Sequence, residues 1–471
     1  MQRFMKKIKE SSLWIIMSLL LFSACKSDDE VENLSDEGTN DWIYRVMDAY
    51  YLWYEDIPEK NNLNFSQSPD KFFESLLSSQ DGVTFDGKWV LFSSIKQKEE
   101  TTKGISESDS YGFEYATFKD NKNYYAWVLY VLPGSPAADA GLKRGDWIIA
   151  IDSDTPNVTN VEAFSQGGAT SFQLADATVE NKTVVFRRRE LVEIASSRAV
   201  ENTPFLKDSV YTIGGKRIGY LLYNGFTSGP NDENDQYDEQ MKDLFIRFKA
   251  QQVREFVLDL RYNQGGLVSS AQLLTSFLAP AEALGKTFCY IEYNKKQEEK
   301  NREELLYKNS QLDNANLDLD RLYVLTGSTT ASASEAVINC LIPYMGRSNI
   351  ILIGEKTVGK RVGSNVFGSK EKYGWLLHPI VLRIYNANHQ ADYANGFMPD
   401  MEVKELIVGK TLYPFGDTNE LLFKEAIQQI TGKQKKKRTS YTMVEDDYLY
   451  LKPFLNMKKV KGLIDDYDNL E

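Results

Sequence analysis

A row of hydroxyl side chains precedes an apolar run in the segment TGSTTASASEAV, residues 326–337. The hydroxyl residues at its centre are Ser328, Thr329, Thr330, Ser332 and Ser334. Ser332 follows a predicted buried strand and begins a predicted helix. A nucleophile there would stand on a tight turn beside a helix N-terminus, which stabilises developing negative charge. The same hydroxyl could simply cap the helix, because serine is a preferred N-cap residue. This segment alone leaves both roles open.

Two glycine-rich segments also follow predicted strands. LDLRYNQGGL, residues 258–267, contains Gly265 and Gly266, which allow the backbone to turn its amides toward a neighbouring pocket, as an oxyanion hole requires. GEKTVGKRVG, residues 354–363, presents Lys360 on a loop between glycines. One βα unit separates Ser332 from Lys360, so we expect both side chains at the same edge of a sheet.

The elements that must position these residues alternate between strand and helix patterns from Arg217 onward. The strand-like segments are RIGYLLY, EFVLDL, RLYVLTG and NIILIG, and the helix-like segments are QYDEQMKDLFIRFKAQQ, SSAQLLTSFL and ASEAVINCLI. Such alternation predicts an α/β domain with a largely parallel sheet, which we place at residues 200–432. The remaining residues, 433–471, form a C-terminal extension with no assigned role.

Two smaller domains are expected upstream. Helical spacing of apolar residues from Ile43 to Trp53, and a Ser68–Pro69 helix start, predict a helical domain at residues 41–105. Residues 106–195 resemble a PDZ domain, since SPAADAGLKRGD is close to the hallmark of that family. The resemblance implies that YGFEY holds a peptide carboxylate on amides near Gly112 and Phe113, while the peptide adds a strand to the sheet. A PDZ domain that only gates the protein is the alternative.

The three motif segments together resemble the carboxyl-terminal processing peptidases, also called tail-specific proteases. That family combines an LDLRxNxGG strand and turn, then SASE, then GxxTxGK, with a PDZ domain upstream, and the resemblance covers about residues 41–432. It implies a multidomain α/β protein with a crotonase-like serine protease core. It also implies endoproteolysis at or near substrate C-termini by a Ser–Lys dyad, with no metal and no cofactor.

The resemblance also implies a role for each site residue. Ser332 is the nucleophile and Lys360 the general base, while Gly265 or Gly266 and Ala333 supply the oxyanion amides. Burial of Lys360 is expected to lower its pKa, because a base must be neutral to accept a proton.

This sequence departs from the family at Ser364. Many members carry a glutamine there that orients the lysine; Ser364 is the candidate for that role here, as a hydrogen-bond partner of Lys360 that reaches less far.

Composition bounds the remaining possibilities. The 471 residues carry a net charge of −12, which disfavours nucleic acid as a partner because phosphate binding needs a basic face. Two histidines, His378 and His389, make a Ser–His–Asp triad and a zinc site improbable. Cys289 and Cys340 lie in apolar surroundings and are predicted to be buried thiols, with a disulfide as the alternative.

The N-terminus has the pattern of a secretion signal. Residues 1–24 contain basic residues, then the apolar run LWIIMSLLLF, then Ser23 and Ala24 before Cys25. This junction resembles a bacterial lipobox, which implies that Cys25 becomes the lipidated first residue. An ordinary signal peptide is the alternative. Residues 25–40 are polar and acidic, which predicts a tether, and SDDE resembles a surface-export signal of Bacteroidetes lipoproteins.

We therefore expect a lipid-anchored cell-envelope protease, on the outer membrane, whose partners are proteins or peptides with free C-termini. A catalytically inactive, PDZ-containing, peptide-binding lipoprotein is the main alternative. A scaffold of an envelope complex is a third.

Overall fold

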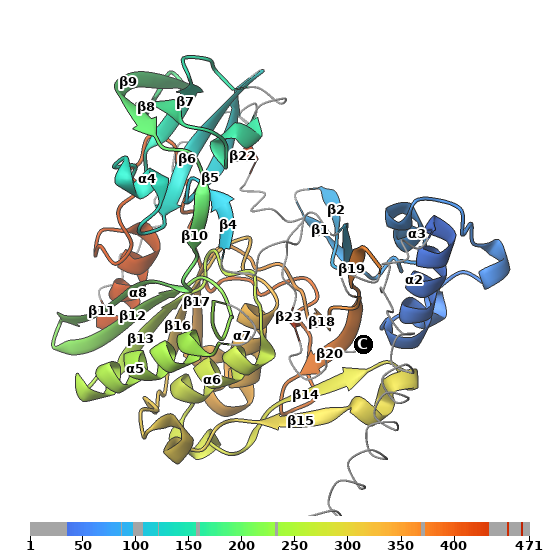
Figure 1. The fold of residues 1–471 in the computed structure, drawn as a ribbon. Helices are drawn as coiled ribbons and strands as arrows, with labels where there is room; N and C mark the ends of the chain where they lie inside the picture. Colours follow the sequence, from blue (N-terminus) through green and yellow to red (C-terminus); the bar gives the residue numbers. More distant parts are fainter. Residues whose placement is uncertain are drawn as a thin grey trace, which may run out of the picture.

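The computed structural model describes residues 35–97, 107–156, 161–230, 234–368 and 373–432, except Asp86 and Asn121, and the short segments 450–451 and 463–464. The predicted signal peptide, Cys25 and most of the predicted tether and C-terminal extension lie outside the described residues. Figure 1 shows three parts: an N-terminal part at the right, a β-rich part at the top and the α/β core below it.

The N-terminal part contains helices α2 (Asp36–Tyr50) and α3 (Pro69–Ser75) and strands β1 (Gly82–Phe85), β2 (Lys88–Leu91) and β3 (Ser94–Gln97). Helix α2 begins at Asp36, so the tether predicted to reach residue 40 ends earlier. Ser35 caps this helix by accepting a hydrogen bond from the Gly38 N–H. The acidic residues there, predicted to belong to the tether, form a first helical turn in which negative charge is stabilising. The predicted helical domain also contains a hairpin, because β1 pairs with β2.

The upper part is one antiparallel sheet in the order β22-β5-β6-β7-β8-β9. Its strands are β5 (Phe113–Asp120), β6 (Asn123–Val131), β7 (Trp147–Ile151), β8 (Thr170–Glu180), β9 (Thr183–Ile194) and β22 (Tyr450–Leu451). Between β6 and β7 lies the short helix α4 (Pro136–Asp139), capped by Ser135. Strands β4 (Glu107–Ser110) and β10 (Arg198–Glu201) pair where the chain enters and leaves this part.

The core contains the predicted parallel sheet, in the order β11-β12-β13-β16-β17-β21. Its strands are β11 (Phe205–Ile213), β12 (Lys216–Tyr223), β13 (Glu255–Asp259), β16 (Leu322–Thr326), β17 (Ile350–Gly354) and β21 (Met401–Glu402). All neighbours are parallel except β11 and β12.

Alternate residues of each strand face opposite sides of this sheet and are buried there by different helices. Helices α5 (Gln236–Ala250), α6 (Val268–Leu278) and α7 (Ala333–Met345) cover one face, and α8 (Leu421–Thr431) covers the other. Cys289 and Cys340 are buried thiols, as predicted, and neither belongs to a disulfide among the described residues.

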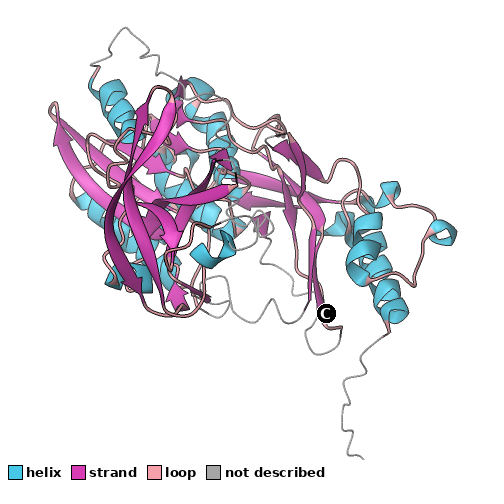
Figure 2. Ribbon diagram, turned by 90° about the horizontal axis from the view of Figure 1, so that it is seen from above, coloured by secondary structure: helices cyan, strands magenta, loops and turns pink. Residues whose placement is uncertain are grey.

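A second core sheet connects the N-terminal part to the core. It has the order β15-β14-β20-β18-β23, from β14 (Thr287–Tyr293), β15 (Arg302–Leu305), β18 (Val362–Ser364), β20 (Ile380–Tyr385) and β23 (Leu463–Ile464). Strand β19 (Trp375–His378) pairs with β3 of the N-terminal part, so the two parts share a small sheet. Seen from above in Figure 2, the helices of the N-terminal part lie at the right, apart from the strand-rich remainder of the molecule.

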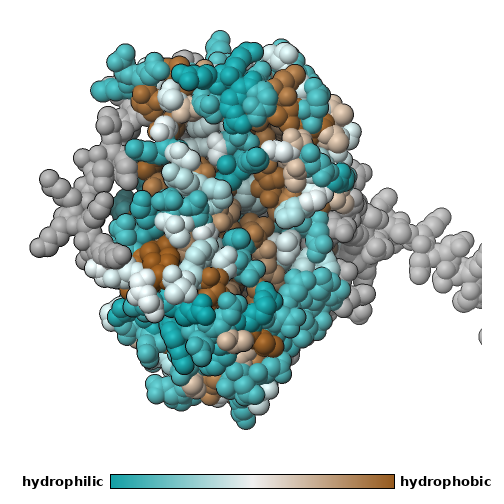
Figure 3. All heavy atoms as spheres, turned by 90° about the vertical axis from the view of Figure 1, so that its left-hand side faces the viewer, coloured by the Kyte–Doolittle hydropathy of each residue, from teal (hydrophilic) through white to brown (hydrophobic). Residues whose placement is uncertain are grey.

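The molecular surface is mixed in character on the face that Figure 3 shows. Hydrophilic residues there surround separate, small hydrophobic areas, which is typical of a surface that contacts water. Among the described residues, every helix is too short or too polar to cross a bilayer.

Candidate active site

The three motif segments leave the same edge of the core sheet, as the sequence predicts. Strand β13 runs beside β16 and β16 beside β17, all parallel, with Asp259 opposite Leu325 and Thr326 opposite Gly354. The segments after these strands therefore emerge side by side, because carboxyl ends of parallel strands share one edge. They carry the glycine turn, the hydroxyl-rich segment and the lysine loop.

Ser332 differs from its neighbouring hydroxyl residues in backbone geometry. It stands at the N-cap position of α7 with φ 61° and ψ −115°, a conformation that is strained for any residue except glycine. A nucleophile on a sharp strand-to-helix turn has this kind of strain.

Three neighbouring hydroxyl groups instead bind the backbone of the glycine-turn segment. Thr330 donates to the Leu260 carbonyl at 2.8 Å, Thr329 to the Arg261 carbonyl at 3.2 Å, and Ser334 to the Asn263 carbonyl at 3.0 Å. They hold the two segments together. The geometry thus separates Ser332 from its structural neighbours.

The glycine turn lies directly against Ser332. Gly265 has φ 108°, and a Cβ atom on it would stand 2.7 Å from the Ser332 Cβ, so no larger residue fits without a shift. Its N–H already donates to the Asn263 side chain at 2.9 Å. The N–H groups of Gly266 and Ala333 have no hydrogen-bond partner among the described residues. Of the three predicted oxyanion donors, Gly266 and Ala333 are therefore available.

Glu335, for which the sequence predicts no role, connects Ser332 to Lys360. Its Oε2 accepts hydrogen bonds from the Ser332 N–H at 3.0 Å and from the Lys360 N–H at 2.8 Å. Its Oε1 accepts from the Gly359 N–H at 2.7 Å and from the Thr357 hydroxyl. Burial raises the pKa of Glu335 to about 7, although these four donors favour the ionised form. One buried carboxylate thus fixes both backbones. The sequence feature that could have indicated this role is the position of Glu335 at the end of the SASE motif.

Lys360 is buried, with 1% of its surface exposed. Its Nζ has no hydrogen-bond partner among the described residues and stands 5.2 Å from the centre of the Phe92 ring. The predicted role of Ser364 is therefore not seen: Ser364 is buried on β18, but it gives Lys360 Nζ no hydrogen bond. Burial lowers the pKa of Lys360 to about 8, while the charges of Asp81 and Glu335 oppose the shift.

The N-terminal part completes the surroundings of this lysine. Asp81 is buried and accepts hydrogen bonds from the Tyr51 hydroxyl at 2.8 Å and the Ser93 N–H at 3.0 Å. Burial raises the pKa of Asp81. His378, on β19, has its pKa lowered to about 4, first by burial and then by nearby lysines, so it is neutral at pH 7. The sequence offered no signal for Phe92 or Asp81, because they belong to another domain.

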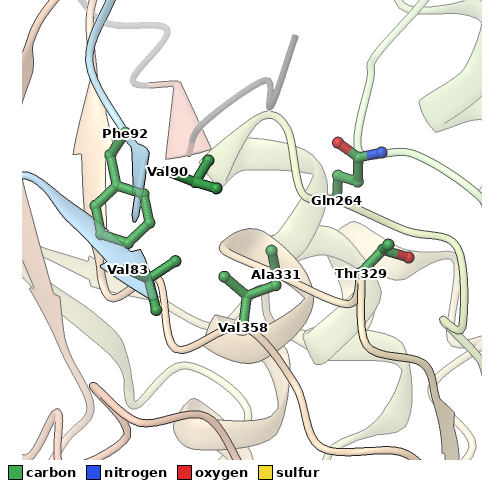
Figure 4. Close-up of a pocket in the computed structure, with 7 residues that line it drawn as sticks. All are labelled: Val83, Val90, Phe92, Gln264, Thr329, Ala331 and Val358. Carbon is green, nitrogen blue, oxygen red and sulfur yellow. The ribbon is translucent and has the colours of Figure 1, made fainter. Parts of the chain in front are cut away.

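An apolar pocket lies between the N-terminal part and the core (Figure 4). Its lining residues are Val83, Val90 and Phe92 on one side and Gln264, Thr329, Ala331 and Val358 on the other. Ala331 immediately precedes Ser332. The pocket therefore lies directly beside the candidate nucleophile.

A buried ion network links the predicted PDZ region to the glycine turn. Arg144 donates to Glu405 at 2.6 Å and to the Tyr262 hydroxyl at 3.1 Å. Glu405 also accepts from Arg261 at 2.9 Å and from Tyr262 at 2.6 Å. Although burial opposes it, the charges of Arg261 and Arg144 lower the pKa of Glu405 to about 2. A shift of Arg144 must therefore break bonds to the residues that precede the glycine turn.

The predicted carboxylate-binding turn lies at the start of β5. Gly112 has φ 78°, and its N–H donates to the Ser110 hydroxyl at 3.1 Å, so this amide is engaged. Phe113 begins β5 opposite Val131. Peptide binding there stays a prediction. Among the described residues, no group of three His, Cys, Asp or Glu side chains is arranged to hold a metal ion.

Comparison with known proteins agrees with this arrangement. Residues 217–403 match the model of peptidase family S41, residues 38–93 match the peptidase S41 N-terminal domain, and residues 127–166 match a PDZ domain. The carboxyl-terminal-processing protease of Picosynechococcus is 26% identical over 309 residues, which cover 65% of this chain and 67% of that protein. The protein of the same name from Synechocystis is 25% identical, with 65% of each chain covered. This chain therefore spans about two thirds of these relatives.

One solved structure is similar to most of this chain and over nearly its own full length. It is a Bacteroides fragilis protein assigned to the S41 proteases, 34% identical, with a TM-score of 0.74, covering 84% of this chain and 98% of that one. The predicted family and the predicted order of N-terminal, PDZ and α/β protease domains are thereby confirmed. This chain belongs to peptidase family S41.

Proposed function

We propose that this protein is a serine endopeptidase in which Ser332 and Lys360 act as a dyad, cleaving proteins at or near their C-termini. The observation that carries the proposal is the Glu335 carboxylate, which binds the backbone N–H groups of Ser332 and Lys360 through a single oxygen. The strained backbone of Ser332 and the burial of Lys360 support it further.

In the proposed reaction, the neutral Lys360 amine accepts the Ser332 proton as Oγ attacks the scissile carbonyl. The N–H groups of Gly266 and Ala333 stabilise the oxyanion. The Lys360 ammonium then gives its proton to the leaving amine as the C–N bond breaks, which leaves an acyl-enzyme. Lys360 next accepts a proton from the water that attacks the ester carbonyl, and returns it to Ser332 Oγ as the C–O bond breaks and the acyl product leaves. The contact between hydroxyl and amine tightens when substrate binds.

The apolar pocket suggests the class of side chain that precedes the cleaved bond. Its described lining is aliphatic and aromatic apart from Gln264 and Thr329, and it includes no charged residue. An apolar side chain therefore suits this lining, although the cavity of about 10 Å³ has to widen to admit one, whereas a charged side chain would lose its hydration without a partner.

We further propose that the PDZ domain binds the C-terminal end of the substrate. The support is β5, whose first residues include Phe113 beside the Gly112 turn. The test uses one apolar, unstructured polypeptide with either a free or an amidated C-terminus. The free form should have the lower KM for the full chain. Equal KM values contradict the PDZ role, and binding of both without cleavage supports the inactive alternative.

The cell envelope is the proposed location, with Cys25 as the site of lipid attachment. The support is the signal-like N-terminus and the small residues before Cys25. In cells, wild-type protein should partition into detergent, whereas the Cys25→Ala variant should be released or remain unprocessed. Identical partitioning and processing of both proteins contradicts lipidation.

A further inference from the structure

Part of the C-terminal extension pairs with the PDZ sheet. Strand β22 (Tyr450–Leu451) is antiparallel to β5, with Tyr450 opposite Phe118 and Leu451 opposite Thr117. Among the described strands, the other neighbour of β5 is β6, so without β22 it would be the edge of that sheet. Figure 1 shows β22 beside β5 at the top of the molecule. The extension therefore covers an edge that would offer unpaired backbone groups to a peptide.

The direction of β22 matches that of a bound substrate tail. Because β22 is antiparallel to β5, the chain advances from Phe118 toward Thr117, and so toward the start of β5 at Phe113. A peptide that adds a strand to β5 with its carboxylate near Gly112 must run in the same direction. Strand β22 and such a peptide therefore require the same backbone N–H and C=O groups of β5.

The same extension also reaches the strand that follows the candidate base. Strand β23 (Leu463–Ile464) is parallel to β18, with Leu463 opposite Gly363 and Ile464 opposite Ser364. Strand β18 begins two residues after Lys360 and, among the described strands, would otherwise be the edge of its sheet. In Figure 1, β23 lies beside β18. Strand β22 thus covers an edge on the PDZ domain, and β23 covers another that begins two residues after Lys360.

We propose that strands β22 and β23 are intramolecular competitors, β22 occupying the β5 edge and β23 the β18 edge until a substrate displaces them. This inference rests on the proposed function, because it takes β5 as the peptide site and Lys360, two residues before β18, as the base of the dyad. When the edge is occupied in most molecules, the apparent affinity for a substrate peptide falls in proportion to the fraction of molecules whose edge is unoccupied. The extension would therefore restrain proteolysis when substrate is scarce.

The test compares the full chain with a chain that ends at Gly432, which follows the last turn of α8. Binding is measured in the Ser332→Ala background with a fluorescent unstructured peptide that has a free C-terminus. If the edge is closed nine-tenths of the time, truncation should tighten binding about tenfold. In the active background it should lower KM to a similar extent. A synthetic peptide of residues 440–471 should reverse both effects competitively.

Two full-length variants assign the effect to each edge. The double variant Tyr450→Pro and Leu451→Pro removes backbone donors from β22 and should reproduce the gain in peptide binding. The double variant Leu463→Pro and Ile464→Pro should raise proteolysis while peptide binding to the PDZ domain stays unchanged. Equal binding and equal KM for the truncated and full chains overturn the inference. If truncation tightens binding but neither chain cleaves, the inference holds and the proposed protease function is wrong.

Discussion

Replacing Ser332 with alanine should reduce kcat on an unstructured protein substrate by about 10⁴-fold or more, because removing a nucleophile leaves only binding and oxyanion stabilisation. The change deletes one oxygen, so the fold should persist. The measurement is turnover of the full chain, with thermal unfolding to show that the variant is folded. Residual activity near the wild-type level contradicts the assignment of Ser332.

The matched control is Ser334→Ala, two residues away in the same motif. Its hydroxyl binds the Asn263 carbonyl at 3.0 Å and so stabilises the contact between α7 and the glycine turn. Its loss should lower stability by about 1 kcal/mol and should leave most of the activity, since that hydroxyl takes no part in the proposed chemistry. A Ser334 variant as inactive as the Ser332 variant would place the nucleophile in doubt.

The order of strands and helices in the core was predictable because each element carries its own periodic pattern. The motif segments follow strands whose apolar runs are unambiguous, and parallel strands bring their carboxyl ends to one edge. Ser332, Lys360 and the glycine turn could therefore be placed together from the sequence alone. The start of α2 was less predictable, because Asp36 and Glu37 suit both an acidic tether and the first turn of a helix.

The supporting residues of the site were not predictable for a different reason. Phe92 and Asp81 approach Lys360 from the N-terminal domain, and Arg144 reaches Glu405 from the PDZ domain. Such contacts depend on how the domains dock, which no local pattern records. Glu335 was closer to prediction, since it is part of SASE, but its bridge to Lys360 requires the loop after β17 to fold back over α7.

The Lys360 variants provide the second large effect. Lys360→Arg keeps the positive charge, but a guanidinium does not release its proton in proteins, so it cannot accept one from Ser332. Lys360→Met keeps an unbranched side chain of similar length and removes the amine that acts as the base. Both variants should lose about as much activity as Ser332→Ala. An active Lys360→Arg enzyme would show that another group is the base.

The dependence of rate on pH follows from the lowered pKa of Lys360. Only the neutral amine can act, and with a pKa of about 8 roughly a tenth of the molecules carry it at pH 7. The kcat/KM should therefore rise with pH and level off above about pH 9. Below pH 7, protonation of Glu335 should steepen the loss, because its pKa is about 7 and it fixes both backbones. A rate that falls steadily from pH 6 to 9 contradicts the dyad.

The groups that face Lys360 should move this profile in opposite directions. Asp81 and Glu335 favour the charged amine, and His378 is neutral above its pKa of about 4. The Phe92 ring, 5.2 Å from Nζ, attracts the ammonium weakly, but it also contributes to the burial that is the largest cause of the lowered pKa of Lys360. Phe92→Ala admits water and should shift the midpoint of the profile to higher pH, whereas Phe92→Leu keeps the apolar cover and should shift it less. Asp81→Asn removes a negative charge and should shift the midpoint to lower pH. Midpoints that stay fixed in all three variants would mean that the titrating group is not Lys360. A mere loss of stability would lower the rate without moving the midpoint in these two opposite directions.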